Sequence, residues 1–554
     1  MKKINILLVL SCLIFGSTTF SQDLKQMKVT WGEEINVNKG DIVEIIGDND
    51  QYVYSLAIKG KKYFLKIFDS QKLAMTSMVE IELPDVANKD VDLEQVIMLN
   101  NQLLAIGSIF DKKAKKFNLV ASKLSVDGKL DPNYSTLFST PVEKKKNRGS
   151  FAFSYSPDEM KMMIMLVSDL KKEKAYQYEA KVINSDAIVL GSVREKVIYG
   201  DDKKEKAQII DFTTNNNADM FIAVNRTKYN RKTKTLTEKF GIAVMKSSNS
   251  YKLERITFDF NGNYAINANL IHMEDGEHVG VVGYYAGTRK NGKASYETEG
   301  IYLAKINIDN NSLEKIKFNP FSIETKSHII GLKKATKERE LSPNYRIRGI
   351  VKDNKGGLIV IGEYYKFSVK KTTSNGKTTT TYTWTYDDVI VSSFDKDGNE
   401  NWTNVIPKAQ TYRNSSSSIN FADAGSSLLV TSSIPYSMKT SKNIYLGIVA
   451  AVHNENIYVI FNDHPKNIGV TAADDFKRIN NPHKGVTTAF VINFNGKMER
   501  IDTDEATQNE VVIRPGISNQ VEENELLIYA SKRKKDKIGR IVFGDSKREE
   551  FTKK

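Results

Sequence analysis

The chain has 554 residues, of which 40% are hydrophobic, 27% charged and 10% aromatic, with 33 glycines, 11 prolines and one cysteine. This is the composition of a folded, water-soluble protein, and it excludes a collagen, a disulfide scaffold and a largely disordered chain. The net charge of +14 arises from 81 basic and 67 acidic residues that are interleaved along the sequence. An even distribution of this kind indicates solubility and predicts no nucleic-acid partner.

The first residues predict export from the cytoplasm. Residues 1–3 are basic at positions 2 and 3, residues 4–15 are almost continuously apolar, and residues 16–21 are mostly small and polar. This is the order of regions in a secretory signal peptide, so we expect residues 1–21 to be removed. The alternative is a lipid anchor on Cys12, the only cysteine. The apolar run is too short to cross a bilayer, and no later run is long enough.

A repeated pattern of turns and strands fills the rest of the chain. Polar turns centred near residues 49, 100, 158, 217, 275, 355, 455 and 523 are each followed by a strongly apolar strand. The step between turns is about 50 to 60 residues, with larger steps late in the chain, and this length fits a four-stranded blade. Several units contain a second tight turn after their third strand. Its sequence is Asp127-Gly128, Asp397-Gly398 or Asn495-Gly496, which are pairs typical of tight hairpin turns.

The two ends of the repeat complement each other. The eighth unit ends near Phe543 after three strands, whereas residues 28–37 form an additional strand before the first unit. A ring closed by that strand leaves no open sheet edge. We therefore predict an all-β fold for residues 22–554, a single β-propeller of eight four-stranded blades. Seven blades, or two or three stacked β-sandwiches, are the alternatives.

Two insertions interrupt the repeat. Residues 321–341 have helical rather than alternating spacing and are predicted to form the one substantial helix. Residues 363–387 predict a long hairpin that turns at residues 375–376, with Tyr382, Trp384 and Tyr386 on one face. The Ser-rich residues 411–418 and the loop 465–485 are expected to lie outside the blades.

Several of these segments resemble a known family. Residues 341–365, the Thr-rich hairpin, residues 394–402 with Ile406-Pro407, and residues 461–467 are similar to an exported β-propeller-like family common in Bacteroidetes. Residues 156–158 (Ser-Pro-Asp) also resemble the strand-turn phrase of TolB-type and WD-like propellers. The resemblance implies an exported propeller and transfers no activity and no site residue.

Motifs for catalysis and cofactor binding are absent from the sequence. None of the six histidines forms an HxxxH or HExxH pair, and His453 and His464 near Asp463 are interpreted as turn residues rather than as a metal or acid–base pair. The sequence holds no Gly-x-Ser-x-Gly elbow, phosphate loop or dinucleotide fingerprint. We therefore predict no catalytic, cofactor-binding or metal-binding residue. The basic runs at 144–148 and 532–535 are interpreted as solvated turns.

These observations favour a non-enzymatic interaction scaffold. We expect a monomeric propeller in the periplasm, at the outer-membrane periphery or outside the cell, with an envelope protein or a glycan as its partner. Tyr382, Trp384 and Tyr386 are the candidate contact residues, because aromatic rings on a projecting hairpin suit partner binding. The alternative for Trp384 is packing against the neighbouring blade or the predicted helix. The alternative function is a hydrolase or lyase with its site in the central funnel.

Overall fold

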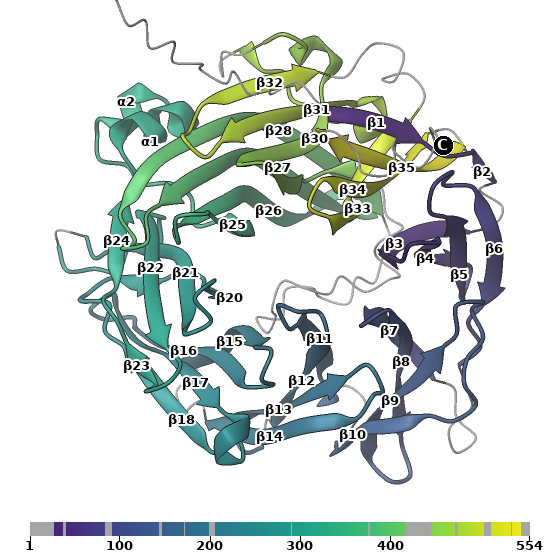
Figure 1. The fold of residues 1–554 in the computed structure, drawn as a ribbon. Coiled ribbons are helices and arrows are strands. Elements are labelled where there is room, and N and C mark those ends of the chain that lie inside the picture. Colours follow the sequence, from purple (N-terminus) through teal and green to yellow (C-terminus); the bar gives the residue numbers. More distant parts are fainter. Residues whose placement is uncertain are drawn as a thin grey trace, which may run out of the picture.

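The computed structural model describes residues 27–36, 40–83, 91–142, 144, 147–170, 172–198, 205–289, 291–374, 377–416, 445–470, 475–502, 511–532 and 535–544. In these residues eight antiparallel sheets surround a central axis (Figure 1). The fold is thus an eight-bladed β-propeller, which confirms the prediction from turn spacing. The expected signal peptide, Cys12, part of the basic run 144–148 and the hairpin turn at 375–376 lie outside the described residues.

Most blades contain four strands, and the first strand of each lies toward the axis (Figure 1). The first four blades consist of β3 (Asp41–Asp48), β4 (Tyr52–Lys59), β5 (Lys62–Asp69) and β6 (Met75–Glu80); β7 (Asp92–Leu99), β8 (Gln102–Asp111), β9 (Lys116–Leu124) and β10 (Ser135–Pro141); β11 (Ser150–Tyr155), β12 (Lys161–Leu170), β13 (Ala175–Asn184) and β14 (Val189–Ile198); and β15 (Glu205–Thr214), β16 (Met220–Asn230), β17 (Thr235–Met245) and β18 (Leu253–Phe258).

Blade 5 is the irregular one, because both its inner and its outer strand are split. The last four blades consist of β19 (Tyr264–Ala265), β20 (Asn269–His272), β21 (His278–Ala286), β22 (Gly300–Asn307), β23 (Ser312–Leu313) and β24 (Lys317–Pro320); β25 (Tyr345–Lys352), β26 (Leu358–Ser374), β27 (Lys377–Phe394) and β28 (Glu400–Ser416); β29 (Val449–His453), β30 (Asn456–Asp463), β31 (Val486–Asn493) and β32 (Met498–Asp502); and β33 (Val512–Glu522), β34 (Glu525–Lys532) and β35 (Lys535–Phe543) with the N-terminal β1 (Met27–Trp31) and β2 (Ile35–Asn36).

The N-terminal strand closes the ring, as predicted. β1 pairs with β35 from Met27 opposite Phe543 to Trp31 opposite Gly539, and β2 pairs with the same strand. Gly539 is needed at this point, because a Cβ there would lie 2.5 Å from the Trp31 ring. The last blade is therefore built from both ends of the chain.

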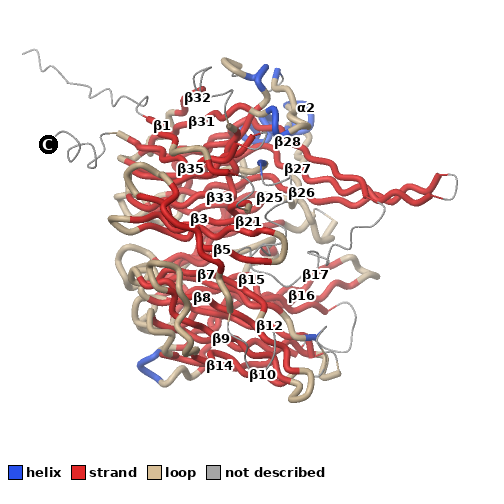
Figure 2. The backbone as a smooth tube through the Cα atoms, turned by 90° about the vertical axis from the view of Figure 1, so that its right-hand side faces the viewer, coloured by secondary structure: helices blue, strands red, loops and turns tan. Residues whose placement is uncertain are grey.

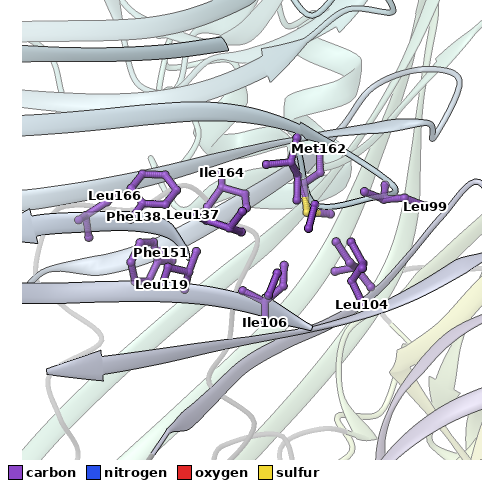
Figure 3. Packing of buried hydrophobic residues seen from close by; sticks show 14 of the residues in the cluster. Leu99, Leu104, Ile106, Leu119, Leu137, Phe138, Phe151, Met162, Ile164 and Leu166 are labelled. Carbon is purple, nitrogen blue, oxygen red and sulfur yellow. The ribbon is translucent and has the colours of Figure 1, made fainter. Parts of the chain in front are cut away.

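Buried apolar clusters between consecutive blades hold the ring together. Figure 3 shows the cluster between blades 2 and 3, which contains Ile106 and Ile164. A corresponding cluster joins blade 8 to blade 1 and contains Leu527 and Val53. Because a middle strand of a blade contacts both neighbouring blades, it is apolar on both faces, and all eight residues of β30 are buried. The strongly apolar strand that follows each turn in the sequence is the middle strand next to the innermost strand of its blade.

The helical insertion is shorter than predicted. Residues 321–341 hold two helices, α1 (Ile323–Ile330) and α2 (Leu332–Ala335), in place of one. The Ser322 side chain caps α1 by accepting a backbone hydrogen bond from its first turn. Gly331, with a φ of +81°, separates the two helices, because a residue in this conformation cannot continue an α-helix. Within the described residues, no helix has the length and apolarity needed to cross a membrane.

The predicted long hairpin has a third strand. β26 and β27 pair out to Ser374 and Lys377, and β28 continues beside β27 until Ser416 pairs with Thr380. The expectation that residues 411–418 lie outside the blades is therefore wrong for 411–416. Apart from Tyr412 the residues of this segment are polar, so it lacks the apolar alternation by which a strand is recognised.

Candidate functional site

The extended parts of β26, β27 and β28 form a three-stranded ribbon that projects from one face of the ring (Figure 2). We call residues 365–374, 377–387 and 409–416 the aromatic ribbon. Its register places aromatic side chains from all three strands on one face, because Tyr365 is opposite Tyr386 and Phe367 is opposite Trp384. Trp384 is in turn opposite Tyr412. The three predicted contact residues thus lie on β27 in the middle of this face.

The rings on this face contact one another. The ring centroids of Tyr365 and Tyr386 are 4.9 Å apart, and the Trp384 ring lies 5.2 Å from Phe367 and 5.7 Å from Tyr412. Tyr382 and Trp384 are each only 8% exposed, and both pack with Leu446, which precedes blade 7. The exposed apolar side chains of the ribbon are instead on β26, where Phe367 is 37% exposed and Val369 49%.

Trp384 is therefore expected to stabilise the ribbon. Replacing Trp384 with alanine should lower the free energy of unfolding by about 3 kcal/mol, because a large buried aromatic side chain is lost. Trp384→Phe should retain most of that stability, since a ring still fills the space between Phe367 and Tyr412. Urea unfolding of the two variants measures both effects. Equal stability of Trp384→Ala and the wild type would contradict this assignment.

Charged side chains are buried where the ribbon joins the ring. Glu363, on β26, is fully buried, and its two carboxylate oxygens face two cations. Arg348 Nε on β25 donates to Oε2 at 2.7 Å, and Lys408 Nζ on β28 lies 2.9 Å from Oε1. Both cations also lie over the Tyr386 ring, 5.9 and 5.7 Å from its centroid. Burial lowers the pKa of Lys408, and the neighbouring Glu363 acts in the opposite direction.

Two adjacent carboxylates follow on β27. Arg478 donates to both oxygens of Asp387, at 2.6 and 3.0 Å. Asp388 is at a register shift of β27, and the backbone N–H of Lys408 donates to it at 3.4 Å. Burial, and then the adjacent charge of Asp387, raise the pKa of Asp388 to about 7. Asp388 can therefore exchange a proton near neutral pH.

The raised pKa of Asp388 predicts a pH dependence of stability. In the unfolded chain this carboxyl returns to its ordinary pKa of 3.8, so between about pH 4 and pH 7 the folded state binds more protons than the unfolded state. The free energy of unfolding contributed by this group is then highest below pH 4 and falls as the pH rises toward 7. Asp388→Asn should remove this part of the slope. Unfolding of variant and wild type across pH 4–8 measures the difference.

Asp502 provides the control for that measurement. Its burial is outweighed by hydrogen bonds from Arg500, so the pKa of Asp502 is lowered rather than raised. The stability that Asp502 contributes is lost only as the pH falls below about 4. Asp502→Asn should therefore differ from the wild type by a constant amount between pH 4 and pH 7. A constant difference for Asp388→Asn as well would contradict the raised pKa.

Side-chain amides fasten the base of the ribbon to the following blades. Gln410 Nε2 donates to the carbonyl of Asn462 at 2.7 Å, and its Oε1 accepts from the N–H of Gly447 at 2.8 Å. Asn462 Nδ2 donates to the carbonyls of Tyr445 and Ile513, both at 2.8 Å. These bonds connect blades 6, 7 and 8, so the ribbon stands on a fixed base.

The histidines that the sequence singled out have local roles. His464 Nδ1 accepts the backbone N–H of Lys466 and caps a short 3-10 helix, and the ring of His453 stacks on Phe543. Among the described residues, no group of histidine, cysteine, aspartate and glutamate side chains is arranged to hold a metal ion.

The buried charges of blade 6 were missed in the sequence. Glu363 directly follows the apolar run 358–362, and Lys408 follows a proline. A charged residue that directly continues a fully apolar strand was the available signal of a buried ion pair, because a buried charge needs a partner of opposite charge. The identity of that partner depends on strand register, which the sequence pattern does not show.

No family model matches the chain, and no curated protein matches it. Similar solved structures include the WD40 domain of SCAP from fission yeast, at 10% identity over 96% of this chain and 97% of that one, with a TM-score of 0.37. The Dos1 propeller is 9% identical over 94% and 96%, with a TM-score of 0.40. The polysaccharide lyase Uly1 is 10% identical over 93% and 100%, with a TM-score of 0.33. These similarities concern the β-propeller fold alone. The resemblance to a Bacteroidetes family stays a prediction.

Proposed function

We propose that this protein is a non-enzymatic scaffold of the cell envelope or its exterior, and that it binds an envelope protein or a glycan through the aromatic ribbon. The observation that carries the proposal is the ribbon itself. It extends three strands beyond the ring, and it carries exposed Phe367 and Val369 next to buried aromatic rings. A projecting segment adds little to the core of the ring, whereas aromatic side chains on a fixed base suit recognition.

The arrangement of the ribbon supports binding on one face. The aromatic face carries Tyr365, Phe367 and Val369 on β26, while Lys366 and Ser368 alternate with them on the other face. Arg346 lies over the Tyr365 ring, 5.2 Å from its centroid, so a cation stands at the ring end of the aromatic face. Arg348 lies over the same ring at 5.7 Å, so a partner would meet apolar rings and the positive charges of two arginines.

Substitution of the exposed ribbon residues tests this proposal. The double variant Phe367→Ala, Val369→Ala should lose capture of envelope proteins and glycans while losing much less stability than Trp384→Ala, because both side chains are more exposed than Trp384. Ser368→Ala, on the opposite face of the same strand, is the matched control and should bind as the wild type does. Comparison of cross-linked partners by mass spectrometry, together with a glycan array, measures binding. Unchanged binding by the double variant would refute the proposal.

A second candidate function, a hydrolase or lyase, has one observation in its favour. Asp388 has a pKa of about 7, and the cations Lys408 and Arg348 lie on the same blade. A carboxyl that titrates near neutral pH suits general acid–base catalysis. Turnover of envelope polysaccharides by the wild type, lost in Asp388→Asn with the fold intact, would establish this alternative.

A further inference from the structure

A cleft away from the aromatic ribbon lies between blades 3 and 4. It has a volume of about 400 Å³, within the range of small-molecule sites. Blade 3 contributes Tyr178 and Val197, and blade 4 contributes Val224 and Ala243 to the apolar part of its walls. Gly241, on β17, also lines the cleft, and a Cβ there would lie 2.7 Å from the carbonyl oxygen of Ile256. The cleft is thus a mainly apolar space between two packed sheets.

Three cations also line this cleft. Arg226 on β16 and Lys239 on β17 are direct cross-strand partners, and Arg255 comes from β18. Like charges placed directly opposite each other destabilise a sheet. Arg255 has an ion pair with Glu195 at 3.7 Å, whereas in the described part of the chain neither Arg226 nor Lys239 has one. Two of the three cations of the cleft therefore lack an acidic partner among the described residues.

Hydroxyl groups complete the lining, and that of Tyr178 is the buried one. Tyr178 is 1% exposed, and its phenol interacts electrostatically with Glu195, Arg255 and Arg226. Burial raises the pKa of Tyr178 to about 12, so the hydroxyl keeps its proton at neutral pH. The cleft thus presents the hydroxyl groups of Tyr178 and Thr257 and at least two cationic side chains beside apolar walls.

We propose that this cleft binds an organic carboxylate that carries an apolar body, with the carboxylate between Arg226 and Lys239 and the apolar part against Val197 and Val224. The anion would relieve the repulsion between the two facing cations, and the walls would remove the apolar body from water. An inorganic anion would neutralise the two cations but has no apolar body, and an alcohol has an apolar body but no negative charge. This site is independent of the aromatic ribbon.

Titration of the purified mature protein with octanoate tests the proposal. Octanoate should bind and raise the melting temperature, while 1-octanol and inorganic phosphate at the same concentrations should bind about tenfold more weakly or not at all. Equal binding of octanol would show an apolar site without charge recognition, and equal binding of phosphate would show an anion site without an apolar part. Either result would overturn the proposal, as would the absence of octanoate binding.

Two variants separate binding from folding. Lys239→Met should weaken octanoate binding about tenfold or more, which is the effect of losing one charged hydrogen bond. The same variant without ligand should melt no lower than the wild type, because the repulsion from Arg226 is removed. Lys252→Met, in the exposed turn before β18 of the same blade, is the control and should leave octanoate binding unchanged. Unchanged binding by Lys239→Met would overturn the proposal.

Discussion

Replacing Glu363 with alanine is expected to lower the free energy of unfolding by about 3–5 kcal/mol. The side chain of Lys408 is fully buried 2.9 Å from Glu363, so its charge would stay in the interior without a counter-charge. Arg348 is 30% exposed and can turn toward water, so Lys408 dominates the cost. Urea unfolding at neutral pH measures the loss.

Two further variants show whether the cost comes from the unpaired charge. The double variant Glu363→Leu, Lys408→Leu should be much more stable than Glu363→Ala, because replacing a buried ion pair by apolar side chains is often neutral. Glu80→Ala breaks the exposed pair with Lys62, which is 2.7 Å long, and should change stability little. If Glu363→Ala unfolds at the same urea concentration as Glu80→Ala, the buried ion pair does not stabilise blade 6.

Deletion of residues 22–37 is expected to destabilise the entire ring. The deletion removes β1 and β2 from the last blade and leaves β35 with an open edge. It also removes Ile35, which is buried between blades 8 and 1, and Trp31, which packs on the cluster between blades 7 and 8. The loss should be at least that of truncating one buried aromatic residue, about 3–5 kcal/mol. A melting curve of the shortened chain measures it.

A rearranged chain distinguishes ring closure from mere loss of residues. Met27 is opposite Phe543 in an antiparallel pair, so residues 27–37 joined after Gly544 by a short turn would form a hairpin with β35. This chain, which begins at residue 38, should recover most of the lost stability. If the shortened chain melts as cooperatively and at the same temperature as the full one, the ring does not depend on β1.

The features that the sequence predicts are those that depend on residues close together in the chain. The turn spacing predicts the eight blades, and period-two alternation places Tyr382, Trp384 and Tyr386 on one face of β27. Ring closure was also predictable, because a spare first strand and a short last unit complement each other. The break at Gly331 was readable in principle, since glycine is a poor helix residue.

The features that the sequence does not predict depend on register between distant strands. The burial of Trp384 requires Tyr412 on β28 and Leu446 beyond it, neither of which lies in the predicted hairpin. The ion pair of Glu363 and Lys408 joins residues on β26 and β28, which do not pair directly. The cleft between blades 3 and 4 depends on the distance between two packed sheets. Alternation along one strand carries no information on that distance.

We expect the pairing of β1 with β35 to form last when the protein folds. Each blade from the first to the seventh is a set of neighbouring hairpins and can form from local contacts, which are rapid to make. The contact between Met27 and Phe543 instead joins the two ends of the described chain, so its entropic cost is paid last. Until then an almost complete ring exposes the backbone edge of β35. Association between chains through that edge would compete with ring closure, so low protein concentration during refolding should favour the closed ring.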